Sequence, residues 1–110
     1  MHELSIVQSV VDTIGDRLGD ARVSRVTLEI GRLSGVVADS VRFCFDLCAV
    51  GTSVEGAALE IRDVPGVAWC PTCQAHFAIA VPLGLCDCGS AELEIVGGRE
   101  LRIKEVEVAA

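Results

Sequence analysis

Apolar residues recur along the chain with two periods, one typical of helices and one typical of strands. Between His2 and about Leu18 they return every three or four positions, which predicts an amphipathic helix with one buried stripe. Gly19 follows where such a helix is expected to end. The predicted stripe consists of Leu4, Val7, Val10, Val11, Ile14 and Leu18, with Asp12, Asp16 and Arg17 largely on the other side.

A second stretch with helical spacing is ADSVRFCFDLCAVGT, which starts at Ala38. Asp39 or Ser40 is expected to cap its start, and Gly51 to close it. The apolar stripe is formed by Val41, Cys44, Phe45 and Cys48, broadened by Leu47. Two thiols one turn apart could chelate a soft metal, but a free cysteine packs as a small hydrophobe, so we expect Cys44 and Cys48 in the core.

Three further segments alternate between apolar and polar residues, which predicts half-buried strands. In the last of them the alternation slips by one between Ile103 and Val106, which predicts a β-bulge or a kink. The inward positions are Val26, Leu28 and Ile30, then Ala57, Leu59 and Ile61, then Leu101, Ile103, Val106 and Val108. The order of elements predicts an α/β fold in which two helices cover one face of a small mixed or antiparallel sheet.

Six cysteines in 110 residues are many, and four of them form two close pairs. Cys70 and Cys73 make a C-x-x-C pair, Cys86 and Cys88 a tighter C-x-C pair, and twelve residues separate the pairs. The segment HFAIAVPL between them can supply a short hairpin strand. In a secreted chain such cysteines would form disulfides, whereas clustered pairs in a cytosolic chain more often bind metal.

This spacing indicates a zinc ribbon inserted into the α/β fold, since four thiolates on two turns close a tetrahedral site with no open position. His76, three residues after Cys73, is an alternative ligand, although an exposed position at a strand edge is its more ordinary role. We expect residues 1–66 and 95–110 to form the α/β domain and residues 67–94 the zinc-binding module.

Charge and composition narrow the function classes. The net charge of −7 and the aromatic content of 4% disfavour nucleic acid as a partner. No apolar run reaches the roughly 18 residues that a membrane span needs, and the start of the chain lacks the pattern of a secretory signal, so we expect a cytoplasmic protein without a membrane partner. With two histidines and no recognisable catalytic set, we do not expect an enzyme.

Several motifs together resemble the HypA/HybF family, the nickel metallochaperones of NiFe-hydrogenase maturation. They are MHEL, FCFDL, GTSVEGAALEI, CPTC with CDCGS, and GRELRIKEVEV, and the resemblance runs from Met1 to about Val108. It implies a cytosolic protein that carries Ni(II) as cargo and Zn(II) as a structural ion. It also implies that the protein acts together with the GTPase HypB and delivers nickel to the hydrogenase large subunit. In some organisms it implies delivery to urease maturation proteins as well.

The resemblance implies nickel ligands at the start of the chain, namely Met1 through its backbone amine, His2 and Glu3. Amine, amide and imidazole nitrogens joined by short chelate rings offer the planar donor set that Ni(II) favours. It implies zinc on Cys70, Cys73, Cys86 and Cys88, and the departure from the family pattern is the C-D-C second pair. The alternative from another class is a zinc-ribbon interaction adaptor without metal delivery.

Overall fold

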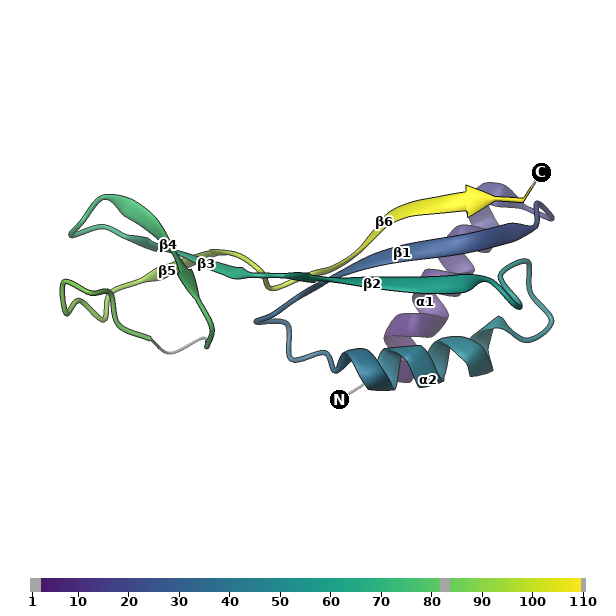
Figure 1. Ribbon diagram of the computed structural model, residues 1–110, viewed down its shortest axis with the longest axis horizontal. Helices are drawn as coiled ribbons and strands as arrows, with labels where there is room; N and C mark the ends of the chain where they lie inside the picture. The colour runs from purple at the N-terminus through teal and green to yellow at the C-terminus, as the bar shows by residue number, and fades with distance from the viewer. Residues whose placement is uncertain (1–2, 82–83, 110) are drawn as a thin grey trace.

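The computed structural model of the protein describes residues 3–81 and 84–109. These residues form two three-stranded sheets, one at each end of a molecule that measures 52 × 26 × 19 Å (Figure 1). The elements in chain order are α1 Glu3–Leu18, β1 Val23–Gly31, α2 Ala38–Ala49, β2 Ala58–Val64, β3 Gly66–Cys70, β4 Ala75–Ile79, β5 Glu94–Gly97 and β6 Leu101–Val108.

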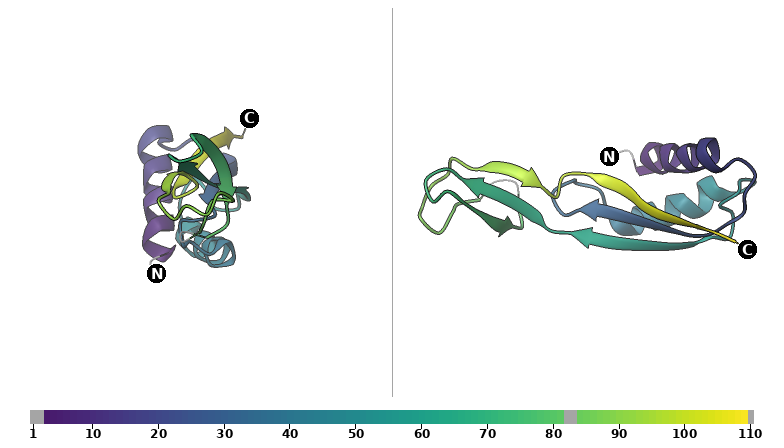
Figure 2. Two further views of the ribbon diagram at one scale, coloured as in Figure 1. Left: turned by 90° about the vertical axis from the view of Figure 1, so that its left-hand side faces the viewer. Right: turned by 90° about the horizontal axis from the view of Figure 1, so that it is seen from above.

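The first sheet is mixed, with strand order β2-β1-β6. Its middle strand β1 runs parallel to β2 and antiparallel to β6. Both helices pack on one face, where Val7 of α1 and Phe45 of α2 meet Val26 and Leu28 of β1 in a single core (Figure 2). The fold class predicted from the periodicity is therefore confirmed. No helix in the described ranges has the length and hydropathy to cross a membrane.

The opposite face of this sheet carries charged side chains instead of helices. Thr27 lies fully buried beneath them, and its hydroxyl lies 3.3 Å from the Glu60 carboxylate, to which it donates. Surface ion pairs of this kind each contribute about 0–1 kcal/mol to stability. Their main effect is therefore to keep this face of the sheet hydrated. The pairs are Arg25–Glu60, Arg25–Glu107, Arg62–Glu60, Arg102–Glu29 and Lys104–Glu29.

The predicted bulge lies in β6. Thr27 pairs with Glu105, but the next residue, Leu28, pairs with Ile103, so Lys104 is an extra residue in the ladder. The insertion turns both Ile103 and Val106 toward the core, although they are three positions apart. The slipped alternation in the sequence is thus confirmed as a bulge.

The start of α2 differs from the sequence prediction. Val37 is the N-cap, and no side chain caps the helix, so the prediction of an Asp39 or Ser40 cap was wrong. The helix begins at Ala38, which places Asp39 inside the first turn, where a carboxylate interacts favourably with the helix dipole. At the other end Gly51 adopts φ +76 directly after the C-cap, as expected of a closing glycine.

Three predicted inward positions are exposed. Leu4 is 55%, Leu47 56% and Val108, at the end of β6, 49% exposed, so these predictions were wrong. Leu4 lies in the first turn of α1 beside Phe43 instead of joining the core cluster, and the short α2 buries only a narrow face against the sheet. Cys44 and Cys48 are half-buried and pack against the core, close to the prediction.

The second sheet is antiparallel, with strand order β4-β3-β5. Strand β4 overlaps the predicted hairpin segment HFAIAVPL but begins one residue before it, at Ala75, whereas β3 and β5 were not predicted. Strand β2 passes through Pro65 directly into β3, and β5 returns through Gly98 to β6, so two chain segments cross between the sheets (Figure 1). The division into residues 1–66 with 95–110 and residues 67–94 stays a prediction.

Backbones approach each other closely where the two sheets join. A Cβ atom on Gly98 would lie 2.5 Å from the Gly66 Cα and 2.7 Å from the Pro65 carbonyl oxygen. The Leu33 amide donates to the Gly98 carbonyl at 2.7 Å, and the Gly31 amide to the Glu100 carbonyl at 2.8 Å. We call this crossing of Gly31, Gly66 and Gly98 the neck.

Gly98→Ala should destabilise the protein more than Gly56→Ala. Both glycines have positive φ, of +87 and +79, but nothing lies within 4 Å of a Cβ on Gly56. Both variants therefore carry the backbone strain of about 1–2 kcal/mol. Only Gly98→Ala adds a clash of about 1–3 kcal/mol. Urea unfolding of the two zinc-loaded variants measures the difference, and equal free energies of unfolding would contradict the tight neck.

Candidate metal centre

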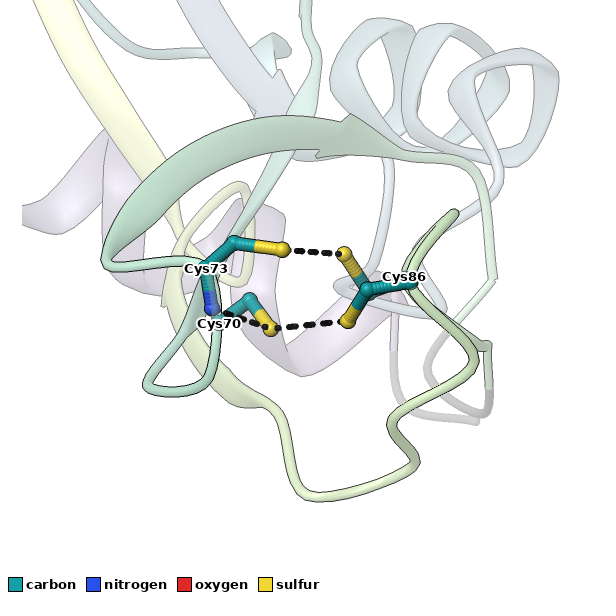
Figure 3. Close-up of side chains that lie close together, drawn as sticks. Cys70, Cys73 and Cys86 are labelled. Atoms are coloured by element: carbon teal, nitrogen blue, oxygen red, sulfur yellow. Dashed lines mark hydrogen bonds between the residues drawn. The ribbon is translucent and has the colours of Figure 1, made fainter.

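Four cysteines from two turns converge at the far end of the second sheet. Their sulfur atoms all lie within 4.8 Å of one another. The Cys73 and Cys86 sulfurs lie 3.6 Å apart and those of Cys70 and Cys88 3.7 Å apart (Figure 3). The two pairs identified in the sequence are therefore brought together in space.

The first pair lies on the turn between β3 and β4. Antiparallel pairing of Cys70 with Ala75 fixes the ends of this turn, and Gln74 adopts φ +53 to close it. The Cys73 amide donates to the Cys70 sulfur at 3.5 Å. Cys70 is buried and Cys73 is exposed, so one sulfur anchors the turn in the module while the other lies at the surface.

The shorter second pair is held by its own tight turn. The Gly89 amide donates to the Cys86 carbonyl at 2.8 Å, and the Cys86 amide donates to the Ser90 carbonyl at 3.1 Å. Gly89 has φ +90, a conformation that favours glycine. The C-x-C spacing therefore still turns both sulfurs toward the first pair.

The geometry of the four sulfurs suits a tetrahedral ion. Two sulfurs each about 2.3 Å from a tetrahedral Zn²⁺ lie about 3.8 Å apart, close to the separations of 3.6 and 3.7 Å in the two pairs. A disulfide would need a sulfur separation near 2.05 Å, and all six cysteines are free thiols. Four protein ligands leave no coordination position for a substrate, which is typical of a structural site.

The thiols of the cluster do not ionise alike. The hydrogen bond from the Cys73 amide lowers the pKa of the Cys70 thiol to about 7. Hydrogen bonding with the Cys88 and Cys86 sulfurs raises the pKa of the Cys73 thiol to about 12. Without a cation Cys70 ionises readily and Cys73 does not, so a divalent ion is the group that lets the sulfurs bind together as thiolates.

His76 lies outside this group of sulfurs. Its ring stacks at a tilt on Trp69, with the ring centroids 4.8 Å apart, because the two residues are direct cross-strand partners in β3 and β4. A pair of this kind stabilises a hairpin. The role of His76 as an alternative zinc ligand stays a prediction. Its stacking on Trp69 offers a structural role for the same residue instead.

The predicted nickel ligands Met1 and His2 lie outside the described residues, and only Glu3 can be placed. Glu3 opens α1 and accepts a hydrogen bond from the Val37 amide at 3.5 Å, so the first turns of the two helices lie side by side. A surface hollow there is lined by Glu3, Leu4, Ser5, Asp39, Ser40, Phe43 and Cys44.

Asp39 is the residue that sequence reasoning missed at this hollow. In the sequence it precedes an apolar helical stripe and was interpreted as a cap. Only the packing of α1 against α2 brings Asp39 and Glu3, far apart in the chain, to line one hollow. No sequence pattern indicates this proximity.

Fold and site define a class of protein: a small α/β metal-binding protein with a four-cysteine centre beyond its core. The chain belongs to the HypA family, since the family model described as "Hydrogenase/urease nickel incorporation, metallochaperone, hypA" matches residues 1–108. This is a family of metallochaperones involved in nickel incorporation and not a family of enzymes.

Named relatives are similar over nearly their whole length. The hydrogenase maturation factor HypA of a Nostoc species is 50% identical over 98% of this chain and 96% of its own. That of Geobacter metallireducens is 48% identical over 98% and 99%. The solution structure of the Ni metallochaperone HypA from Helicobacter pylori matches with a TM-score of 0.72 and 27% identity, covering 100% of this chain and 99% of that one.

Replacing His76 should leave the four-cysteine site intact, whereas replacing Cys73 should destroy it. We expect Co²⁺ added to metal-free protein to give the intense thiolate absorption of a tetrahedral site, saturating at one ion per chain in the wild type and in His76→Ala. Cys73→Ser should lose this spectrum. Anaerobic titration followed by visible absorption makes the measurement, and a changed spectrum in His76→Ala would make histidine a ligand.

Proposed function

We propose that the protein is a nickel metallochaperone that binds Ni(II) with the first residues of its chain and delivers it for assembly of the NiFe-hydrogenase active site. The observation that carries the proposal is the family match over residues 1–108, which includes the MHE start. In this proposal the four-cysteine site holds Zn(II) as a structural ion on Cys70, Cys73, Cys86 and Cys88.

The proposed nickel ligands are the Met1 amine, the amide and imidazole nitrogens of His2, and Glu3. Nitrogen donors in one plane with a carboxylate nearby match the tetragonal preference of Ni(II). The hollow beside Glu3 adds the carboxylate of Asp39, and two helix N-termini meet there. The positive ends of the two helix dipoles favour negative charge, which both carboxylates supply.

A site at the very start of the chain suits a carrier better than a permanent holder. Glu3 is half-buried at the helix end, and the hollow beside it is open to a partner's ligands. The unperturbed pKa values of about 7.7–8.0 for an α-amine and about 6.5 for histidine mean that protons compete with nickel. Because both groups must be deprotonated to bind, nickel affinity should fall as the pH falls through this range.

Zinc in the second sheet would act on folding. Among the described residues between 67 and 94, only Ala68, Cys70 and Ile79 are buried, too few for an independent hydrophobic core. Metal binding would supply the missing folding free energy of this module. We therefore propose residues 67–94 as the zinc-binding module and residues 1–66 with 95–110 as the nickel-binding domain.

The proposal includes the partners that the family resemblance implies. Nickel would pass in the cytoplasm to the large subunit of a NiFe hydrogenase, with the GTPase HypB taking part, and in some organisms toward urease. The matching family model names both hydrogenase and urease in its description.

His2→Ala should abolish nickel binding and leave zinc and folding unchanged, since the imidazole is the proposed cargo ligand and lies outside the core. His76→Ala, at the only other histidine, is the matched control and should bind nickel normally. Calorimetry with Ni²⁺ on untagged protein, with zinc quantified in parallel, provides the measurement. Wild-type nickel stoichiometry in His2→Ala would refute the assignment.

A Gly-Ser extension before Met1 should block nickel binding, because it converts the terminal amine into an amide. The same extension after Ala110 should have no effect, and both proteins should keep their zinc. Equal nickel affinity with and without the N-terminal extension would exclude the amine as a ligand. Such a result would favour the adaptor hypothesis over metal delivery.

A further inference from the structure

Exposed apolar side chains gather around α2. Among the described residues nine large apolar side chains are exposed, and five of them lie on α2, at its two caps or in the first turn of α1. These five are Leu4, Val37, Phe43, Leu47 and Val50. Contiguous apolar surface on a soluble protein commonly marks a site of interaction.

Three of these residues form a stripe with helical period. Phe43, Leu47 and Val50 follow one another at spacings of four and three, which stacks them along one side of α2. We call these three residues the outer stripe. The buried Val41 and Phe45 each precede a stripe residue by two positions, or about 200° around the helix. Helix α2 is therefore apolar on two opposite sides, of which one packs against the first sheet.

The outer stripe has no part in the packing of the chain itself. None of its residues belongs to the core cluster or to the side chains packed against that cluster. In the view of Figure 1 no helix or strand of the described chain lies on the side of α2 that is remote from the sheet. A helix that is apolar on opposite sides is typical of one that is covered on both. The stripe is thus left for a partner.

Carboxylates flank the outer stripe. Asp39 lies four positions before Phe43 and Asp46 three positions after it, so both are neighbours of the stripe on the helix surface. Both acids are exposed, and neither forms an ion pair with a residue in the described ranges. Arg42, the one cation of α2, instead donates to a backbone carbonyl of β2 at 3.3 Å. Negative charge beside the stripe therefore favours a partner that carries lysine or arginine.

The same charge disfavours two other occupants. A second copy that docked through this face would set identical carboxylates against one another, because the acids lie beside the stripe on the same helix. A membrane surface rich in anionic lipids would repel them as well. The charge pattern therefore favours a different protein with a basic and apolar surface.

The backbone of α2 favours a helix as the docking segment. The peptide groups inside α2 are paired within the helix, so they offer an incoming strand no hydrogen bonds. A segment that presses apolar side chains onto the outer stripe must satisfy its own peptide groups, and a helix does so internally. Two helices can then pack with interlocking ridges, their axes about 8–10 Å apart.

We propose that the outer stripe of α2 is a docking surface for an amphipathic helix of a partner protein, whose own apolar stripe is flanked by lysine or arginine. Phe43, at 68% the most exposed of the large apolar side chains, is the anchor, since aromatic rings gain most from burial at an interface. Asp39 and Asp46 pair with the partner's cations. No proposed nickel ligand belongs to the stripe, so docking does not require nickel.

The test titrates a model helix into the zinc-loaded, nitrogen-15-labelled protein and follows the backbone amide signals by nuclear magnetic resonance. The probe is a synthetic peptide of leucine and lysine, about four helical turns long, with its leucines at helical spacing. The amide signals of residues 39–50 should shift, and the shifts give the dissociation constant. A matched peptide of leucine and glutamate should bind about tenfold more weakly or worse.

Two variants remove the two parts of the surface separately. Leu47→Ser removes an apolar contact and Asp46→Lys reverses a flanking charge, and each should raise the dissociation constant about tenfold. Neither residue lines the hollow beside Glu3, so nickel binding should stay unchanged. Val96→Ser on β5 and Asp20→Lys after α1 are the matched controls, since they make similar changes at exposed positions away from α2 and should bind the peptide normally.

Unchanged amide signals from the core strand β1 show that each variant is folded. Absence of binding, shifts confined to other elements, equal binding of the glutamate peptide, or controls that weaken binding as much as Leu47→Ser would each overturn the proposal. Sedimentation velocity on the same samples tests the other occupant. Self-association of the wild type that Leu47→Ser abolishes would assign the stripe to a second copy and also overturn it.

Discussion

The close crossing of backbones at the neck is the constraint on which the arrangement of the whole molecule depends. Gly98 lies so near Gly66 that no side chain fits between them, and hydrogen bonds from the 31–33 segment join the crossing strands. Strand β2 passes through this point directly into β3. The two sheets are therefore connected by hydrogen-bonded backbone and not by a loose linker, so that metal binding at one end takes place on a frame continuous with the other.

The two sheets are stabilised by different interactions. The first sheet buries apolar side chains from both helices in one core, and its charged outer face needs no cover. The second sheet buries little, and its turns instead hold four sulfurs at separations that suit a tetrahedral ion. The pKa of the Cys70 thiol is lowered and that of the Cys73 thiol is raised. These opposite shifts also favour a bound cation, because thiols this close cannot all ionise without one.

Although the chain is acidic overall, its acidic and basic side chains line different surfaces. Carboxylates of Glu3, a proposed nickel ligand, and of Asp39 line the hollow where the two helices start. Four cationic side chains line the groove between α1 and β6, namely Arg17, Arg99, Arg102 and Lys104. These two surfaces do not share a residue, so a change in one can be made without altering the other.

The sequence by itself determined the periodic elements, the β6 bulge and the pairing of the four cysteines, because side-chain alternation, helical spacing and ligand spacing are local properties. Strands β3 and β5 could not be predicted, since four or five residues show too little alternation and are strands only through pairing. The exposed Leu4 and the uncapped start of α2 likewise followed from packing. Only the tertiary structure brought Asp39 beside Glu3 and left β6 at an edge, because burial and proximity depend on contacts between residues distant in the chain.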